Sequence, residues 1–411
     1  MNRLFVALGL GLVTLLLVAC GGSATSIPAA APVATTAAAA AAAPAGEQRE
    51  VHFYQVNAAT GQSAAYGSRS IHGVDLAVKH INEAGGFADD CGNNYTVKVT
   101  LHDMANSREQ AIAGIRKAAD DPTVLAALGS TPSTGFVPMV PVAGQVKLPI
   151  IATGSAAPIA EWNPYAFRVT ITTQAAAPQF MKTMKDELDI DQVAIIYDIS
   201  QDAQRAEAEL IRDLAAEIGY EMTAFEAFRA GDKDFRAQLT TIRGTNPKWV
   251  GIYGATPEGT AIINQMDEMG FLDEVNFFTG FGSFNDPKWW DLTEGRVNGG
   301  VNWAVGFDLE SDDPAMMKVV ADYASSFDDD ITIYSLYGYQ ALQTAVDAVK
   351  RSCTATDREK FRDALATTKI DALAGPVSFN SPRAAPLGEN QAGSILVVRI
   401  TGRGSFVELG K

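Results

Sequence analysis

The sequence predicts an α/β protein made of two doubly wound, Rossmann-like lobes joined by a hinge of three crossovers. From residue 51 onward a strand, a glycine-rich turn and an amphipathic helix follow one another repeatedly, and this alternation restarts after Phe167. Strict alternation at this spacing favours parallel sheets with helices on both faces. Two apolar strands, at residues 124–128 and 149–152, each run into a turn of small hydroxyl and glycine residues. Ligands bind beyond the carboxyl ends of such strands, so residues 129–157 are expected to hold one.

Length and composition indicate how many domains the chain can form and which partners its charge excludes. The chain has 411 residues, of which 47% are apolar and 19% are charged, which is enough for two domains with substantial cores. Its formal net charge of -16 argues against nucleic-acid binding, because that function depends on clustered Lys and Arg.

The N-terminus predicts export. Within residues 1–19, Arg3 is followed by a continuous apolar run that ends in Leu17-Val18-Ala19-Cys20. This ending resembles a bacterial lipobox, which predicts cleavage before Cys20 and lipidation of that residue. An ordinary signal peptide or a short membrane helix are the alternatives, although the run is too short to span a bilayer comfortably. Residues 20–47, rich in Ala, Pro and Thr, are expected to form a disordered spacer.

The first lobe is expected to begin at residue 48. Its predicted strands are residues 51–56, 95–101, 124–128 and 149–152. Its predicted helices are residues 71–81, 107–119 and 137–146, with a turn-rich loop at residues 57–67.

The second lobe repeats the pattern. Its predicted helices are residues 175–188, 203–218, 235–243 and 259–269, and its predicted strands are residues 193–197, 222–228, 249–253 and 275–279. Beyond Gly299 come a strand at 301–305, helices at 314–327, 336–350 and 358–367, and extended segments at 377–379, 394–400 and 406–409.

These last elements are too few for a third domain, so the chain is expected to return and complete both lobes. The three crossovers are placed near residues 167–170, 302–306 and 379–383. The first lobe then comprises residues 48–168 and 302–378, and the second comprises residues 169–301 and 379–411.

Two cysteines follow Cys20, and in an exported protein they are candidates for one disulfide. Cys91 and Cys353 are 262 residues apart, so pairing requires both to lie in one lobe, as they do in this arrangement. The alternative is two separate buried thiols.

Several short motifs occur in a fixed order along the chain. They are Thr60-Gly61, Ala65-Tyr66-Gly67, residues 73–77, Ile81-Asn82, Ala84-Gly85-Gly86, residues 194–198, residues 231–235 and residues 375–379. Over about residues 50–410 their order and spacing resemble type I periplasmic solute-binding proteins of the leucine/isoleucine/valine-binding class. The resemblance implies two lobes that close on a small molecule, and delivery of that molecule to an ABC importer.

The resemblance assigns the ligand's carboxylate to two loops of the first lobe. Ser133 and Thr134 fall on the first loop, and Gly154, Ser155 and Ala156 fall on the second. Hydroxyls and exposed amides at a helix start supply the charge-assisted hydrogen bonds that a carboxylate needs. Capping of the helix by Ser133 and Thr134 is the alternative and is compatible with binding.

The second lobe departs from the family's pattern. Asp202 stands where many members carry a ligand-stacking tyrosine, Thr256 lies near a second aromatic position, and Phe281 lies near the acid that binds the ligand's ammonium. Either Asp202 pairs with the ammonium from another direction, or the ligand has no amine and Phe281 forms an apolar slot with Tyr66. Tyr66 matches a family aromatic that lines the cleft. The structural alternatives are lobe packing for Tyr66, an N-cap for Asp202 and core packing for Phe281.

These observations predict a solute-binding component of an ABC importer for a small amino acid or related organic carboxylate, with no enzymatic activity, cofactor or metal. The alternatives are a binding protein for a non-amino organic acid or amide, such as an aromatic acid or a urea-type amide, or a ligand-sensing module of the same fold. The expected partners are the solute, an ABC permease and the membrane through the lipid anchor. The protein is expected to be an exported monomer, anchored to the outer face of the cell membrane or periplasmic.

Other motifs do not predict chemistry. Residues 131–135 lack the first glycine of a nucleophile elbow, Gly280-Phe281-Gly282 lacks the third glycine of a dinucleotide loop, and the four histidines have no metal-binding spacing. Asp312-Asp313 before Pro314 predicts a helix start, and Asp328-Asp329-Asp330 predicts a solvated turn. Trp289-Trp290 predicts an amphipathic helix face, or otherwise a cleft rim.

Overall fold

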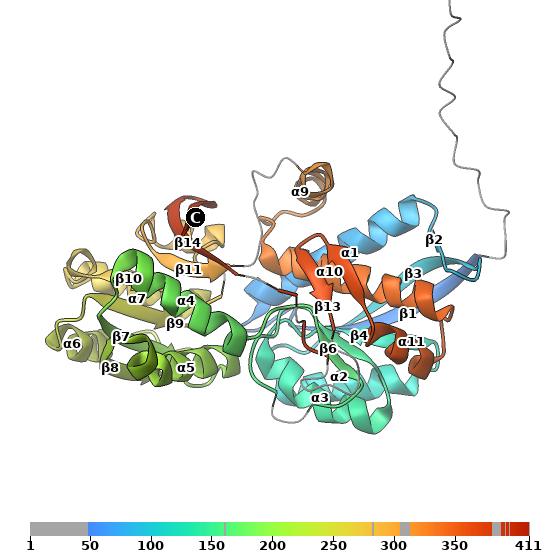
Figure 1. Cartoon of the computed structure of the whole chain (residues 1–411), viewed down its shortest axis with the longest axis horizontal. Helices are drawn as coiled ribbons and strands as arrows, with labels where there is room; N and C mark the ends of the chain where they lie inside the picture. The colour runs from blue at the N-terminus through green and yellow to red at the C-terminus, as the bar shows by residue number, and fades with distance from the viewer. Residues whose placement is uncertain are drawn as a thin grey trace, which may run out of the picture. The chain divides into compact units, whose positions relative to one another are not determined.

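Two β-sheets with helices on both faces organise the protein, shown in Figure 1 as a computed structural model. The structure describes residues 48–159, 162–281, 283–304, 313–379, 388–390, 392–393 and 395–410. The predicted export signal, Cys20 and the spacer at residues 20–47 lie outside these residues, as do residues 305–306 and 380–383 of two predicted crossovers. In the described part, no helix combines the length and the apolar character needed to cross a membrane.

The first sheet has six strands in the order β2-β3-β1-β4-β5-β6. Its strands are β1 (Gln48–Asn57), β2 (Phe87–Ala88), β3 (Asn94–Asp103), β4 (Val124–Leu128), β5 (Ile150–Ala152) and β6 (Ala166–Arg168). Neighbouring strands are parallel except for the short β2, which pairs antiparallel with β3. All five residues of β4 are buried, as expected for a parallel strand covered on both faces.

Helices from the two ends of the chain cover the first sheet. They are α1 (Ala64–Glu83), α2 (Arg108–Asp120), α3 (Ser133–Val146), α10 (Ile333–Ser352) and α11 (Arg358–Leu365). Successive residues of β1 point to opposite faces: Phe53 packs with α1, α10 and α11, whereas Tyr54 packs with α2 and α3. We call this unit, with α9 (Pro314–Ser326) beside α1 and the hairpin of β12 (Lys369–Ala372) and β13 (Gly375–Ser378), the first lobe.

The second sheet has seven strands in the order β15-β14-β11-β10-β9-β7-β8. Its strands are β7 (Gln192–Asp198), β8 (Glu221–Phe228), β9 (Trp249–Tyr253), β10 (Asn276–Phe278), β11 (Val301–Ala304), β14 (Leu396–Gly402) and β15 (Ser405–Leu409). Strands β8, β7, β9, β10 and β11 are parallel, and β14 and β15 add an antiparallel edge.

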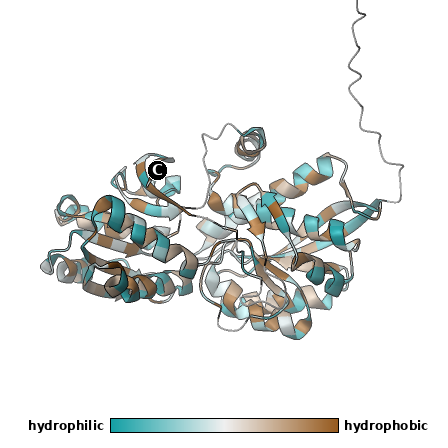
Figure 2. Cartoon of the chain, in the orientation of Figure 1, coloured by the Kyte–Doolittle hydropathy of each residue, from teal (hydrophilic) through white to brown (hydrophobic). Residues whose placement is uncertain are grey.

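Helices also cover both faces of the second sheet. They are α4 (Thr173–Leu188), α5 (Asp202–Ile218), α6 (Arg236–Gly244), α7 (Thr256–Glu268) and α8 (Pro287–Leu292), with the short 3-10 helix η1 (Leu272–Glu274) after α7. Ile195 of β7 packs with α4 and α5, and its neighbour Ile196 packs with α6, α7 and α8. We call this unit the second lobe. In Figure 2 many helices of both lobes are banded with hydrophilic and hydrophobic residues, as expected for amphipathic helices on a sheet.

Close helix packing in the first lobe explains two glycines. A Cβ on Gly73 of α1 would lie 1.8 Å from the carbonyl oxygen of Ser335, and one on Gly338 of α10 would lie 2.1 Å from the carbonyl oxygen of Ser70. Each helix therefore needs a residue without a side chain where the other helix crosses it. This contact fixes the start of α10 against the middle of α1.

The predicted α/β fold with two doubly wound sheets is confirmed, and the C-terminal strands return to the second sheet as expected. One boundary is wrong: residues 302–304, assigned to the first lobe, belong to β11 and pair with β14 of the second sheet. The sequence analysis did not predict β2, β6, β12 and η1, none of which exceeds four residues, whereas the helix expected at Trp289-Trp290 is α8. It also placed residues 64–67 in a loop, whereas α1 begins at Ala64.

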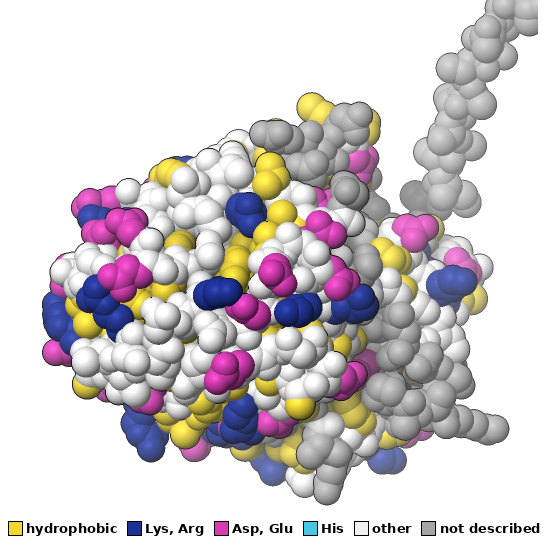
Figure 3. Space-filling view, turned by 60° about the vertical axis from the view of Figure 1, so that its left-hand side comes forward, with side chains coloured by type: hydrophobic (Ala, Val, Ile, Leu, Met, Phe, Trp, Pro, Cys, Tyr) yellow, Lys and Arg dark blue, Asp and Glu magenta, His cyan; other side chains and the backbone are white. Residues whose placement is uncertain are grey.

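A disulfide joins Cys91, in the loop before β3, to Cys353 at the end of α10. Both cysteines lie in the first lobe, so the bond ties its N-terminal half to its C-terminal half. On the face shown in Figure 3 acidic and basic side chains are intermingled, so the net charge of -16 does not form a single acidic patch on that face.

Candidate ligand-binding site

A cavity lies between the two lobes and is lined from both sides. The first lobe contributes residues at the starts of α1, α3 and α10 and in the loop after β5, and the second lobe contributes residues at the starts of α4 and α5 and at the ends of β9 and β10. The lining residues are Ser63, Tyr66, Thr131, Pro132, Ser133, Gly154, Ala156, Thr173, Gln201, Ala203, Gln204, Glu207, Tyr253, Gly254, Thr279, Gly280, Phe281, Ser283 and Tyr334.

Three helices that start at this cavity, α1, α3 and α5, have no side-chain cap. The residues that precede them are Ser63, Pro132 and Gln201, which all line the cavity. Of the helices that start elsewhere, α2, α9 and α11 are capped by a side chain, whereas α6 is not. The first N–H groups of an uncapped helix carry partial positive charge and can bind an anionic group.

The loop after β5 is held rigidly in the first lobe. Ser133 Oγ lies 2.9 Å from Ser155 Oγ and accepts a hydrogen bond from Ala157 N at 3.2 Å. Behind the loop, the buried Arg168 donates from Nη1 to the carbonyl oxygens of Ala157, at 2.7 Å, and Ser155, at 3.3 Å. Its Nη2 donates to Glu389 Oε1 at 2.5 Å. Both faces of the loop therefore have hydrogen-bond partners before any ligand binds.

Thr131 on the neighbouring loop is fixed by a buried asparagine. Asn57, at the end of β1, donates from Nδ2 to Thr131 Oγ1 at 3.0 Å and accepts from Thr131 N at 3.1 Å. Thr131 Oγ1 also lies 2.9 Å from Thr153 Oγ1. The sequence analysis missed Asn57, because an asparagine at a strand end is common in turns.

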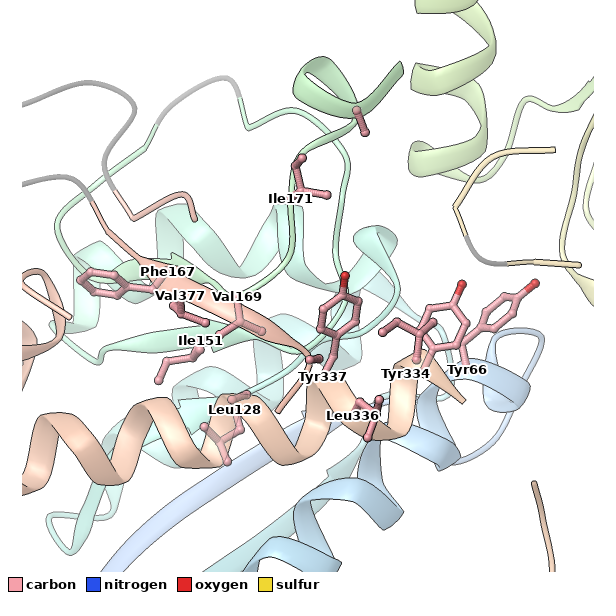
Figure 4. Packing of buried hydrophobic residues seen from close by; sticks show 14 of the residues in the cluster. Tyr66, Leu128, Ile151, Phe167, Val169, Ile171, Tyr334, Leu336, Tyr337 and Val377 are labelled. Carbon is pink, nitrogen blue, oxygen red and sulfur yellow. The ribbon is translucent and has the colours of Figure 1, made fainter. Parts of the chain in front are cut away.

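Aromatic rings form one wall of the cavity. The rings of Tyr66 and Tyr334 lie 4.9 Å apart, side by side in Figure 4, and Phe281 meets Tyr334 edge-on at 5.7 Å. The Tyr66 hydroxyl crosses to the second lobe, where it accepts hydrogen bonds from Thr256 N at 3.1 Å and from Thr256 Oγ1 at 3.3 Å. Burial raises the pKa of Tyr66 to about 12, so this hydroxyl is neutral at physiological pH.

One acidic side chain enters the cavity from α5. Glu207 Oε1 accepts a hydrogen bond from Trp303 Nε1 at 2.7 Å. Room for the carboxylate exists because residue 280 is glycine: a Cβ there would lie 2.3 Å from Glu207 Oε2. Burial raises the pKa of Glu207 to about 7, although hydrogen bonds from Trp303 and the Phe281 backbone lower it in part. Among the described residues that line the cavity, Glu207 is the only Asp, Glu, His, Lys or Arg.

The predicted site residues divide into two groups. Tyr66, Ser133, Gly154, Ala156 and Phe281 line the cavity. The other four lie near it without lining it; they are Thr134, Ser155, Asp202 and Thr256. Thr134 Oγ1 donates to Asn106 Oδ1 at 3.0 Å, and Ser155 and Thr256 bond to lining residues as described above.

The placement of Asp202 argues against its proposed role as an ammonium partner. Its carboxylate pairs with Arg108 of the first lobe at 2.6 Å and with Arg205 of its own helix at 3.1 Å. Two guanidinium groups already compensate its charge, and it stands at the first turn of α5, where an acid is favourable.

Trp289, predicted to lie on a helix face or at a cleft rim, is buried in the second lobe and does not line the cavity.

Sequence reasoning missed Glu207 and Tyr334, which both lie on helix faces turned toward the cavity. One signal could have indicated Glu207: it shares the inner stripe of α5 with Ala203 and Ile211, at helical spacing. An acid on an apolar stripe requires an explanation, because charged groups are rarely buried without a partner. Tyr334 has no such signal, since an aromatic residue on an inner helix face usually packs in a core.

The described histidines do not converge on a metal site. His72 and His80 bond to Asp329 and Asp322 respectively. In the described part of the chain, the one group of His, Cys, Asp or Glu side chains close enough to share an ion contains Asp89 and the two disulfide-bonded sulfurs.

Two α/β lobes that meet on a cavity lined from both sides define a protein that holds a small solute between its lobes. The chain belongs to the type I periplasmic binding proteins, because the model of the periplasmic binding protein family matches residues 55–395. Proteins of this family are solute-binding components of ABC transporters.

Proteins similar to this chain are named for different ligands. The Leu/Ile/Val-binding protein homolog 1 of Brucella abortus is 26% identical over 298 residues, covering 71% of this chain and 76% of that protein. A leucine-binding protein from Thermotoga maritima superposes with a TM-score of 0.76 at 22% identity, covering 88% of this chain and 98% of the other. A solute-binding protein from Rhodopseudomonas palustris in complex with 3,4-dihydroxybenzoic acid has a TM-score of 0.76 at 17% identity, with 88% and 96% covered.

Proposed function

We propose that the protein binds an amino acid in its zwitterionic form. The observation that supports this proposal is Glu207, the one acid among the described lining residues, opposite the uncapped start of α3. The N–H groups there, with Ser133, would hold the ligand's carboxylate, and Glu207 would hold its ammonium. The resemblance places the family's ammonium-binding acid near Phe281, and Glu207 brings a carboxylate from α5 to Gly280, beside that position.

Electrostatics favours a zwitterion over a plain organic anion. An anionic ligand would share the closed cavity with an ionised Glu207, and like charges in a low-dielectric site repel strongly. It could bind only with Glu207 protonated. An amino acid instead supplies the ammonium that compensates the buried carboxylate, so ligand binding would shift Glu207 toward its ionised form.

The aromatic wall suggests where the ligand's side chain would lie. Phe281, Tyr334 and Tyr66 offer apolar ring surface at one end of the cavity. Small apolar side chains gain stability from such contacts in proportion to the area they bury. This supports leucine, isoleucine and valine as the first ligands to test, in agreement with the names of several relatives.

Calorimetric titration of wild-type and Glu207→Gln protein with L-leucine, L-isoleucine and L-valine tests the proposal. We expect at least one of them to bind the wild type, and Glu207→Gln to weaken that binding at least thirtyfold, about 2 kcal/mol, because truncating one partner of a buried charge pair costs about 2–5 kcal/mol. Glu217→Gln, on the exposed face of the same helix, is the matched control and should leave affinity unchanged.

A second candidate is an aromatic acid, supported by the aromatic wall and by the pKa of Glu207 near 7, which leaves part of it protonated. Titration with 3,4-dihydroxybenzoate and with 4-methyl-2-oxopentanoate, the deaminated analogue of leucine, separates the two. Binding of these anions in preference to the three amino acids, strengthened by Glu207→Gln, would refute the zwitterion proposal.

We further propose that Cys20 is lipidated and anchors the protein outside the cell membrane, where it serves an ABC permease as a monomer. The lipobox-like ending at Cys20 supports the anchor. Metabolic labelling with a radioactive fatty acid is expected to label the wild type and to leave Cys20→Ala unlabelled. Equal labelling of both would contradict it. A ligand-sensing role for the same fold would appear instead as solute binding without solute uptake.

A further inference from the structure

An ion pair between the lobes lies buried behind the cavity. Arg69 of α1 pairs through Nη1 with Asp286 Oδ2, in the turn before α8 of the second lobe, and each side chain is 1% exposed. We propose that Arg69 and Asp286 are positioning residues that keep the two lobes together around the solute. The proposal goes beyond the choice of ligand and rests on the family's closure around a solute.

Burial makes this pair sensitive to the loss of either member. Within the described residues, Arg69 Nε and Nη2 have no hydrogen-bond partner, so the guanidinium depends on its ion pairs for compensation. Removing one partner of a buried pair leaves the other charge unpaired in a low-dielectric site, whereas replacing both by apolar groups is often neutral. Loss of either charge therefore penalises the closed arrangement specifically.

A second acid explains how Arg69 tolerates separation of the lobes. Asp329 Oδ2, in the first-lobe turn between α9 and α10, lies 3.7 Å from Arg69 Nε. Asp329 also bonds through Oδ1 to His72 Nδ1 and to the Tyr323 hydroxyl, both at 3.0 Å. When the lobes part, Arg69 keeps this neighbour on its own lobe.

Asp286 likewise has a role within its own lobe. Its Oδ1 accepts a hydrogen bond from Lys288 N at 2.9 Å and caps α8. Both open and closed arrangements are thus compatible with the wild-type charges. The acidic triplet at residues 328–330 is a turn, as predicted, and two of its acids form ion pairs, since Asp330 pairs with Arg403 at 2.8 Å.

The pair is linked to the cavity through α1. Tyr66 precedes Arg69 by three residues, so the two side chains lie on one helix face. Tyr66 lines the cavity and reaches Thr256, while Arg69 reaches Asp286, and both contacts join the lobes. Breaking the ion pair is therefore expected to release Tyr66 from the second lobe as well.

Another ion pair between the lobes provides a matched control. Arg108 of α2 pairs with Asp202 of α5 at 2.6 Å, but the Arg108 side chain is 49% exposed. Exposed pairs contribute little because water competes with them and flexible side chains lose entropy. The charge type and the two lobes are the same, and burial is the main difference.

Double electron–electron resonance, which measures the distance between two spin labels, tests the inference. The full chain is used with no solute added, so the result is independent of the proposed ligand. Labels at Lys117→Cys on α2 and Thr240→Cys on α6, both exposed, report the lobe separation. We expect Asp286→Asn and Arg69→Met each to lower the closed population at least tenfold, Asp202→Asn to change it less than threefold, and Arg69→Met/Asp286→Leu to restore most of it.

Unfolding by urea, followed by circular dichroism, checks that each variant is folded. Asp286→Asn keeps a side-chain acceptor for the α8 cap, so its lobe should remain intact. Identical distance distributions in wild type and both single variants, including distributions without a closed population, would overturn the proposal. So would a double variant no more closed than the single ones, because the loss would then reflect structural damage and not an unpaired charge.

Discussion

The two walls of the cavity are built on different principles. The first-lobe wall consists of backbone groups and hydroxyls around Ser133 and Gly154, held by Asn57 and Arg168 from behind. The second-lobe wall carries the one carboxylic acid among the described lining residues, Glu207, in a space that Gly280 leaves open. Under the proposed function, the first wall would bind any carboxylate. The second wall would then distinguish one class of carboxylate from another.

The difference extends to the energetics of folding. The first wall is satisfied within its own lobe, since its hydroxyls and carbonyl oxygens already have partners. The second wall has a buried carboxyl whose pKa is raised to about 7, which means that its ionised form is poorly compensated. A site that destabilises the protein until its ligand arrives is a recurrent feature of functional positions.

Among the predictions that follow, Gly280→Ala in the second wall should cause the largest loss of ligand affinity. The new Cβ would lie 2.3 Å from Glu207 Oε2, so the carboxylate must move. We expect at least a thirtyfold loss of affinity for whichever of L-leucine, L-isoleucine and L-valine binds the wild type, similar to Glu207→Gln. Isothermal titration measures it. Gly244→Ala, at the end of α6 with open space around its Cα, is the control and should bind normally.

The second wall, unlike the first, should make the free energy of unfolding depend on pH, and this is the next largest expected effect. Burial raises the folded-state pKa of Glu207 to about 7, above its ordinary value of 4.5, so the folded protein binds the extra proton. This group therefore lowers the free energy of unfolding as pH rises from about 4.5 to 7, by about 3 kcal/mol in total. Urea unfolding of Glu207→Gln and wild type should give equal stability near pH 4.5, and a stabler variant above pH 7. A constant difference would mean that burial does not raise this pKa.

The difference between the two walls also explains which features could be predicted from the sequence. Parallel sheets, most helices and the binding loops of the first lobe follow from local signals, because apolar strands that end in Gly-Ser-Thr turns are recognisable in isolation. Glu207 is not, since its role depends on Gly280 and Trp303, which are 73 and 96 residues away in the chain. The interpretation of Asp202 as an ammonium partner also depended on a distant residue, because only the fold shows that Arg108, 94 residues away, pairs with it.

The smallest effect that we predict is a difference in ligand affinity between variants of two neighbouring hydroxyl residues, Ser133 and Thr134. Ser133 lines the cavity, whereas Thr134, the next residue, donates its hydroxyl to Asn106 and does not line it. Ser133→Ala should lower affinity for the amino acid about tenfold, since a hydrogen bond to a charged group contributes about 1.5–3 kcal/mol.

Thr134→Val, which keeps the shape of the side chain, should change affinity less than threefold, and the double variant should match Ser133→Ala. Thermal unfolding without ligand serves as the control for folding. If Thr134→Val weakens binding as much as Ser133→Ala, the N-terminus of α3 acts as a unit and the cavity must extend to Thr134. Unequal effects would show that the first wall, though built from common groups, still binds the carboxylate through particular atoms.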